Sequence, residues 1–228
     1  MDKTAALLGA LESGPLSLAG LVAATQLPRP TTHRLAVALE HHRLVARDDR
    51  GRFILGPRIV ELAAAAGTDR LVAAAAPVLV WLRDTTGESA QVYRRVGDER
   101  VCVAAAERES GLRDTVPVGS ALPMTAGSAA QVLLAWEDAE TTRRLGAAAR
   151  FSPAALAQVR RRGWAHTVGE RESGVASVSA PVRATTGRVV AAISVSGPIE
   201  RLTRTPGRLF AAPVVTAAER LTRQLAAG

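Results

Sequence analysis

A run of polar and basic residues between positions 29 and 34 carries side chains that can recognise DNA. An arginine side chain can donate two hydrogen bonds to a guanine, and a threonine can contact a thymine methyl group or a phosphate. The N–H groups of a helix's first turn can also hold a phosphate oxygen. The candidate DNA-contacting residues of this run are Arg29, Pro30, Thr31, Thr32, His33 and Arg34. The alternative is that they form the solvated first turn of an ordinary helix.

Three further arginines surround a turn of sequence DDRG. Arg47, Arg50 and Arg52 lie where apolar and basic residues alternate, which is typical of a two-stranded β-ribbon. Arginines on such a ribbon can contact DNA phosphates. Because Asp48 and Asp49 weaken the positive field locally, we expect the ribbon to position the DNA backbone more than to read bases.

The elements that would hold these residues follow the order of a winged helix-turn-helix over residues 1–56. Apolar periodicity predicts helices over about 2–12, from Ser17 to the turn at 25–28, and over about 29–42. Pro30 suits the first turn of the last helix, where a missing N–H costs nothing. The inward-facing positions expected in the second and third helices are Leu18, Leu21, Val22, Leu35, Val37 and Leu39.

Composition favours a globular chain of two domains. The 228 residues are 47% hydrophobic, and no run of 18 apolar residues could span a bilayer. The N-terminus lacks the pattern of a signal peptide, so we expect a cytoplasmic protein without membrane contact. Cys102 is the single cysteine and there are four histidines, so we expect neither a disulfide nor a metal or other cofactor. The net charge of +8 lies mostly outside the first 66 residues, and charge alone does not locate the DNA-contacting module.

The remaining chain predicts a linker helix within 57–67 and an α+β domain over 68–228. A helix capped by Thr68 or Asp69 should run to about 85 with Leu71, Val72 and Leu79 inward, either as a core helix or as part of a dimer. Period-two patterns predict a hairpin with strands over 91–95 and 99–104 around a turn at 96–98, and further strands over 113–117, 177–183 and 188–196. Helices are predicted over 126–136, 139–145, 153–162 and 208–225. Leu209 is expected on the inward face of the last helix. An antiparallel sheet flanked by helices is typical of sensor domains.

Four blocks of the sequence together resemble one protein family. LVAATQLPRPTTHRLAVALEHHRLVARDDRGRFILGPRIVELA is similar to the DNA-binding domain of the IclR family of bacterial transcription regulators, including an Arg-x-x-Leu-Gly ending at Arg52, Leu55 and Gly56. The blocks VPVGSALPMTAGSAAQVLLAW, RRGWAHTVGERESGVASVSAPVR and GRVVAAISVSGPIERLT continue the likeness. Taken over these four blocks, the sequence most resembles actinobacterial regulators of leucine and other amino-acid biosynthesis genes.

The resemblance implies a homodimer, or a dimer of dimers, that binds a double-stranded DNA operator. It also implies a C-terminal GAF-like domain that binds a small effector, either a carboxylate or an amino-acid-like compound. Carried over residue by residue, the effector site comprises Leu112, Met124, Ser128, Ala129, Thr167, Val175, Ser177, Ser194 and Ser196.

The chemistry of these residues suits a carboxylate. Serine hydroxyls and helix N–H groups can bind one without a full positive charge, while Leu112, Met124 and Val175 would offer apolar walls. Thr167 stands where many relatives have an acidic residue, so an ammonium group would need Glu170 or Glu172. The alternative is that the serines only satisfy backbone groups.

Two functions remain open, and an enzyme is not expected. One is a nucleoid-associated regulator whose operator affinity depends on the effector. The other is a constitutive DNA-binding regulator whose C-terminal domain only oligomerises. A hydrolase would need a nucleophile and a base, but there is no G-x-S-x-G motif and His166 is the only C-terminal histidine.

Overall fold

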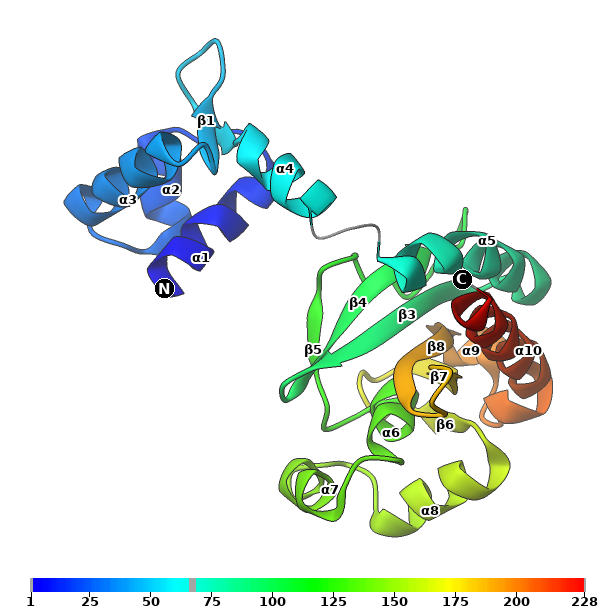
Figure 1. Ribbon diagram of the computed structural model, residues 1–228. Coiled ribbons are helices and arrows are strands. Elements are labelled where there is room, and N and C mark those ends of the chain that lie inside the picture. The colour runs from blue at the N-terminus through cyan, green and yellow to red at the C-terminus, as the bar shows by residue number, and fades with distance from the viewer. Residues whose placement is uncertain (1, 66–68, 228) are drawn as a thin grey trace. The chain divides into compact units, whose positions relative to one another are not determined.

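The computed structural model describes residues 2–65 and 69–227. The chain forms two compact units, one through Asp69 and one from Arg70 onward (Figure 1). Within the described residues, no helix is long and apolar enough to cross a membrane.

The first unit is a helical module with a small antiparallel ribbon. Its elements are α1 (Asp2–Ala10), the 3-10 turn η1 (Leu11–Ser13), α2 (Leu18–Thr25), α3 (Arg29–His41), β1 (Val45–Arg47), β2 (Phe53–Leu55) and α4 (Pro57–Ala65). Leu7, Leu11, Leu21, Leu39 and Phe53 form the centre of its core. The predicted winged helix-turn-helix is therefore present.

Local chemistry explains where these helices begin and turn. The Ser17 hydroxyl accepts a hydrogen bond of 3.1 Å from the N–H of Gly20 and caps α2. Gln26 adopts a left-handed conformation, with φ of 56°, and ends that helix. Gly56 must lack a side chain, because a Cβ would lie 2.2 Å from the carbonyl oxygen of Arg43. This close approach accounts for the glycine of the Arg-x-x-Leu-Gly motif.

The second unit is built on one six-stranded antiparallel sheet of order β5-β4-β3-β8-β7-β6. Its elements are α5 (Arg70–Thr86), β3 (Ser89–Val96), β4 (Glu99–Ala106), β5 (Ala121–Pro123), α6 (Ser128–Leu134), α7 (Ala139–Gly146), α8 (Pro153–Arg162), β6 (Ala165–Val168), β7 (Val175–Arg183), β8 (Val189–Pro198), α9 (Ile199–Leu202) and α10 (Pro206–Ala226). The α+β fold with an antiparallel sheet is as predicted.

Each face of this sheet has its own hydrophobic core. One core joins α5 and α10 to the sheet, and the other joins α6, α7 and α8 to the opposite face (Figure 1). Because side chains alternate along a strand, Val178 and Val195 enter the first core, while Ser177 and Ser194 face α6 on the other side. This alternation brings the serines of two neighbouring strands together.

Several local predictions were wrong. The segment 113–117 is not a strand, and β5 pairs with β4 instead, through residues 121–123. Glycines with positive φ at 111 and 119 interrupt extended structure around that segment. The strand β6 had no prediction, because its four residues give too short a pattern.

Three side chains expected inside are exposed: Val37, Val72 and Leu209, with exposed fractions of 44%, 36% and 60%. In α3 the neighbouring residue Ala36 is buried instead of Val37, and in α5 Leu71 is buried as expected but Val72 is not. The last two residues of the expected linker helix, 66 and 67, and the expected cap at Thr68 lie outside the described residues.

Candidate DNA-binding surface and effector cavity

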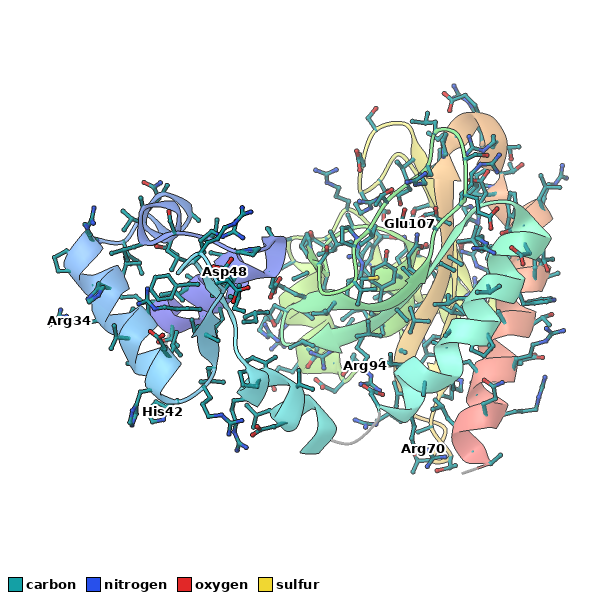
Figure 2. The ribbon with its side chains drawn as sticks, turned by 90° about the horizontal axis from the view of Figure 1, so that it is seen from above. Arg34, His42, Asp48, Arg70, Arg94 and Glu107 are labelled. Carbon is teal, nitrogen blue, oxygen red and sulfur yellow. The ribbon has the colours of Figure 1, made fainter. Side chains whose placement is uncertain are left out.

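The exposed side of α3 carries most of the predicted DNA-contacting run. Arg29, Pro30, His33 and Arg34 are exposed, and Thr31 is half-buried. Arg34 projects from the outer side of the helix (Figure 2). These residues belong to the first two turns of α3, the part of a recognition helix that contacts bases in a helix-turn-helix.

Thr32 does not belong to this surface. Its side chain is fully buried, and its hydroxyl donates to the carbonyl oxygens of Leu27 and Pro28 at 3.3 and 3.2 Å. Thr32, Ala36 and Leu39 are spaced along the inner face of α3, all buried. The expectation that Thr32 contacts DNA is therefore wrong, because this threonine holds the turn that precedes the helix.

Two of the three ribbon arginines already have partners. Arg47 donates to Glu40 at 3.0 Å and stacks over Phe53, and Arg52 pairs with Asp48 at 2.6 Å. The hydrogen bond from Arg52 lowers the pKa of Asp48, which stays ionised. Arg50 is exposed, and its side chain has no partner in the described part of the chain. It is the ribbon arginine most available to a phosphate.

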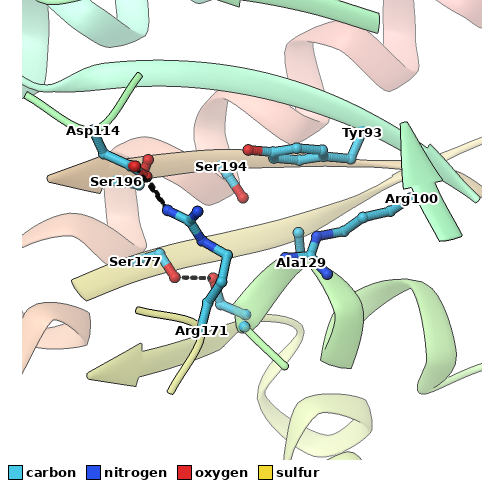
Figure 3. A pocket seen from close by; sticks show the side chains of 10 residues that line it. Tyr93, Arg100, Asp114, Ala129, Arg171, Ser177, Ser194 and Ser196 are labelled. Carbon is cyan, nitrogen blue, oxygen red and sulfur yellow. Dashed lines mark hydrogen bonds and ion pairs between the residues drawn. The ribbon is translucent and has the colours of Figure 1, made fainter. Parts of the chain in front are cut away.

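The second unit contains a small cavity between the sheet, the start of α6 and two loops (Figure 3). Its lining residues are Tyr93, Arg100, Asp114, Gly127, Ser128, Ala129, Arg171, Ser177, Ser194 and Ser196. Five of the nine predicted effector residues therefore lie together here, from α6, β7 and β8.

The serine hydroxyls are linked to one another as well as to the cavity. The Ser128 oxygen lies 2.7 Å from the oxygens of both Ser177 and Ser179, and Ser179 is hydrogen-bonded to Ser194. The Ser196 hydroxyl donates to the side-chain oxygen of Gln91 at 3.1 Å. A hydroxyl donates one hydrogen bond and accepts up to two, so this network keeps some capacity for a ligand.

The other four predicted residues do not line the cavity. Thr167 lies behind it and hydrogen-bonds to Ser177 at 3.0 Å. Met124 is fully buried in the core beside α6, and Val175 pairs with Pro198 at the end of its strand. Leu112 is 72% exposed. The expected apolar side chains therefore form no wall of this cavity, because loop and strand geometry turn them elsewhere.

Sequence reasoning missed the charged residues of the cavity. Arg171, in the loop before β7, places one guanidinium nitrogen 2.7 Å from both carboxylate oxygens of Asp114, in the loop after β4. Arg100 enters from β4 beside the ring of Tyr93 (Figure 3). A binding site without full positive charge was expected, but the cavity contains two guanidinium groups.

The carboxylates expected to hold an ammonium group are already engaged. Glu170 accepts hydrogen bonds from the N–H of Gly127 at 2.5 Å and from Gln131 at 3.2 Å. Glu172 is an exposed side chain that lies 3.4 Å from Arg171. The cavity's own carboxylate is Asp114, which sequence reasoning did not select.

The cavity is nearly closed in this conformation. Its volume is about 20 Å³, which is room for about one water molecule. Asp114 and Arg171 join two loops across it, so a larger ligand requires these side chains to shift. Burial lowers the pKa of Arg100 to about 10, which leaves it charged at neutral pH.

A larger groove, of about 650 Å³, lies over α7 and α8. Phe151 and Leu156 form apolar parts of its wall, and Arg143 and Arg160 are its cations. None of the predicted effector residues lines this groove. The volume of a groove alone therefore does not identify where an effector binds.

Family models and relatives match nearly the whole chain. The IclR helix-turn-helix domain matches residues 1–49, and the bacterial transcriptional regulator IclR C-terminal domain matches residues 63–223. A Cupriavidus necator protein, "Probable transcriptional regulator SauR", is 31% identical over 83% of this chain and 81% of that protein. The "HTH-type transcriptional repressor AllR" of Escherichia coli K12 is 30% identical over 89% and 81%.

A solved structure shows the same fold. The crystal structure of an IclR homolog from Microbacterium hydrocarbonoxydans, complexed with 4-hydroxybenzoate, has a TM-score of 0.84 and 21% identity, and covers 99% of this chain and 98% of that one. Both domain matches fall on the two units in the same order. The chain belongs to the IclR family of bacterial transcriptional regulators, whose members bind DNA through the N-terminal helix-turn-helix.

Proposed function

We propose that a small carboxylate binds in the cavity of the second unit and changes the affinity of the protein for its DNA operator. The observation that carries this proposal is the meeting of two arginines and four serine side chains at one cavity. Guanidinium groups form strong, charge-assisted hydrogen bonds to carboxylates. Regulation then requires that the effector bind the DNA-competent and DNA-incompetent arrangements with different affinity.

On the DNA side, we propose base contacts from Arg29, Thr31, His33 and Arg34, with Arg50 on a phosphate. The first unit has little net charge, with eight basic and seven acidic residues through Asp69. A single copy therefore has a weak electrostatic attraction for DNA. Two paired copies with a few well-placed arginines would supply the affinity.

We propose that exposed apolar side chains of the linker helix and of α5, each within its own unit, take part in pairing with another copy. Val60 and Leu62 on α4 are 71% and 44% exposed, and Val80 on α5 is 43% exposed. Exposed apolar side chains favour contact with another protein surface. A homodimer or a dimer of dimers would cover them.

We also propose that the regulated genes belong to amino-acid metabolism, leucine or branched-chain biosynthesis in particular. The support for this pathway is the resemblance of the amino-acid sequence to regulators of such genes. The names of SauR and AllR do not mention amino-acid biosynthesis. A carboxylate effector is compatible with this pathway, whose intermediates include oxo acids. Operator binding would place the protein at the nucleoid, in the cytoplasm.

Two experiments test the proposed pathway and the proposed effector mechanism. The first maps the bound sites across the genome, and the second titrates the operator complex with metabolites of the mapped pathway. We expect bound sites upstream of amino-acid genes and a change in operator affinity with at least one carboxylate. A constitutive DNA-binding protein whose C-terminal domain only oligomerises would show operator affinity unmoved by every metabolite. Bound sites upstream of other genes would contradict the proposed pathway but not the proposed effector mechanism.

A further inference from the structure

The second unit carries nearly all of the net charge of the protein. From Arg70 onward the chain has 21 basic and 14 acidic residues. Most of the excess is concentrated in two segments, because residues 141–169 hold six arginines and residues 173–199 hold two, and neither segment has an acidic residue. These segments contain most of α7, all of α8 and the strands β6, β7 and β8. The charge is therefore a local property of one part of the unit.

Six arginines of α7, α8 and the β7–β8 hairpin lie near one another, and we call them the arginine surface. They are Arg143, Arg160, Arg161, Arg162, Arg183 and Arg188. Arg143 and Arg160 line the same groove over α7 and α8 (Figure 1). Arg160 also donates a hydrogen bond of 2.7 Å to the carbonyl oxygen of Ala135. The guanidinium of Arg183 lies 4.5 Å from the ring centre of the next residue, Trp136.

The end of α8 meets the end of β7 on the same surface. Gly163, which directly follows α8, lines one hollow together with Arg183. Arg188 lies across the hairpin turn, where its carbonyl oxygen accepts a hydrogen bond of 2.9 Å from the N–H of Ala184. The six arginines are therefore neighbours in space, although they come from three elements.

The arginine surface has no carboxylate partners. Within residues 2–65 and 69–227, none of its six guanidinium groups lies within ion-pair distance of an acidic side chain. Three of them donate only to backbone carbonyl oxygens, namely Arg160, Arg162 and Arg183. Other arginines of the second unit do have such partners, since Arg83 pairs with Asp84 at 2.7 Å and Arg113 with Glu107 at 3.0 Å.

The acidic side chains nearest to this surface do not cancel its charge. They are Asp98, Glu137, Asp138, Glu140 and Glu219. Three of them pair with arginines outside the surface, Glu137 with Arg95, Asp98 with Arg144 and Glu219 with Arg223. Asp138 accepts a hydrogen bond from the N–H of Thr141 and caps α7. With these arginines included, the region holds nine arginines and five carboxylates, so a clear positive excess remains.

An extended polyanion fits this arrangement better than a small ligand does. The arginines are spread over two helices and a hairpin, and Arg143, Arg160, Arg161 and Arg188 are exposed. Guanidinium groups form bidentate, charge-assisted hydrogen bonds to phosphates. Like charges that lie this close repel one another, and a row of phosphates would relieve the repulsion.

We propose that the arginine surface of the second unit binds the phosphate backbone of DNA that flanks the operator. The family binds DNA through its helix-turn-helix, but the first unit has an excess of only one positive charge through Asp69. Attraction to DNA grows with the number of phosphates that a protein neutralises. The second unit would supply the attraction that the first unit lacks. This inference goes beyond the proposed function and needs no effector.

The salt dependence of binding to a mixed-sequence DNA duplex tests the contact with the full chain. The variant is Arg143→Gln combined with Arg161→Gln, because both side chains are exposed and neither has a partner in the described residues. We expect the slope of log K against log salt concentration to become shallower by about 1–2, since each phosphate contact contributes about 0.9. A wild-type slope in this variant overturns the proposal.

A matched control separates a contact from the general charge of the protein. Arg83→Gln combined with Arg113→Gln also removes two positive charges, and Arg83 belongs to α5, on the opposite face of the sheet from α7 and α8. This control should keep the wild-type slope. An equal loss in both variants would show that only net charge matters, which overturns the contact.

Two further measurements exclude a trivial cause. The combination of Arg143→Lys and Arg161→Lys keeps both charges and should keep most of the slope. The glutamine variant should melt as the wild type does, because exposed substitutions without partners cost little stability. A lysine variant that loses the slope as completely as the glutamine variant contradicts a phosphate contact based on charge.

The length of the operator fragment tests the place of the contact. One fragment ends at the half-sites, and the other carries an additional helical turn of DNA on each side. The wild type should bind the longer fragment more tightly, and Arg143→Gln with Arg161→Gln should lose this gain. An equal gain in both proteins would contradict binding to flanking DNA.

Poly-L-glutamate distinguishes DNA from an acidic protein as the partner. If the glutamine variant loses affinity for poly-L-glutamate but keeps the wild-type slope on DNA, the surface faces an acidic protein and the proposal is overturned. None of these measurements contains an effector. Operator affinity that no carboxylate changes would therefore contradict the proposed function and leave the DNA contact in place.

Discussion

Adjacent residues of α3 have different tasks because successive helical side chains point about 100° apart. Arg34 is exposed on the outer side of the helix, whereas Thr32 is fully buried and donates to two backbone carbonyls. A polar run in a sequence does not distinguish these cases. The burial of neighbours such as Ala36 distinguishes them in the structure.

Substitution of Arg34 should therefore change DNA binding, whereas substitution of Thr32 should change stability. Arg34→Ala should weaken operator binding by about 1–3 kcal/mol and relax the preference at one base pair, without changing stability. Thr32→Val should destabilise the first unit by about 1–2 kcal/mol through its lost hydrogen bonds. Operator titration and urea unfolding of both variants measure this, and wild-type operator affinity in Arg34→Ala would remove it from the contact surface.

His166 should make the stability of the second unit depend on pH. Its Nδ1 is buried without a partner, and burial, followed by the charge of Arg162, lowers its pKa below the ordinary 6.5. The folded protein therefore favours the neutral ring, and the unfolded chain binds the proton more readily. This contribution to stability is complete above pH 6.5 and is lost as the pH falls below it.

Urea unfolding between pH 7.5 and 5.5 checks this sign. The wild type should lose stability relative to His166→Leu, which has no titrating ring, as the pH falls. Parallel pH profiles of the two proteins would show that the ring does not titrate differently on folding.

At the scale of elements, strand periodicity places Ser177 and Ser194 at the cavity, whereas the charged residues come from two loops and from β4. Ser177 and Ser194 could be predicted, because they alternate with buried apolar residues on β7 and β8. The pair between Asp114 and Arg171 joins residues 57 positions apart, and no local pattern indicates such a contact. Arg100 follows an exposed hairpin turn, so its sequence context is that of a surface arginine.

Removal of the Asp114 charge should change which anion the cavity accepts. Asp114→Asn leaves Arg171 without its carboxylate partner, so the lining would carry one more positive charge than in the wild type. Hydroxymalonate, a dianion, should then gain affinity relative to lactate, a monoanion. Calorimetric titration of both proteins measures this ratio, and an unchanged ratio would show that this ion pair does not set the charge selectivity.

The junction between the ribbon and α4 depends on Gly56. Gly56→Ala should destabilise the first unit by about 1–3 kcal/mol, because the new Cβ meets the backbone of Arg43 and cannot be relieved by a side-chain shift. Gly9→Ala is the control, since a Cβ there meets nothing within 4 Å on a helix. Urea unfolding should show a loss only for Gly56→Ala, and equal stability of the two variants would contradict the close approach.

At the scale of the whole molecule, the proposed DNA contacts and the proposed effector cavity lie in different units. The family, the module order and the sheet class follow from sequence blocks that span the chain, because repeated local signals agree with one another there. The charge of the cavity could not be predicted, since it depends on contacts between distant loops. The net charge of +8 also did not locate the DNA-contacting module, because most of this charge belongs to the second unit.

The coupling that we propose between operator binding and anion binding is a free energy, so it must be reciprocal. If a monoanion weakens or strengthens operator binding, the operator must change the affinity for that anion by the same factor. This relation gives an internal check on any measured effect.

The most direct test is operator affinity measured with and without saturating lactate or pyruvate, two small carboxylates, in the wild type and in Arg100→Met, which lacks one of the two cavity arginines. We predict a change of about 5–150-fold in the wild type and none in the variant, with both proteins binding the operator equally when no anion is present. Operator affinity that stays constant in the wild type, or that shifts equally in Arg100→Met, would contradict the account.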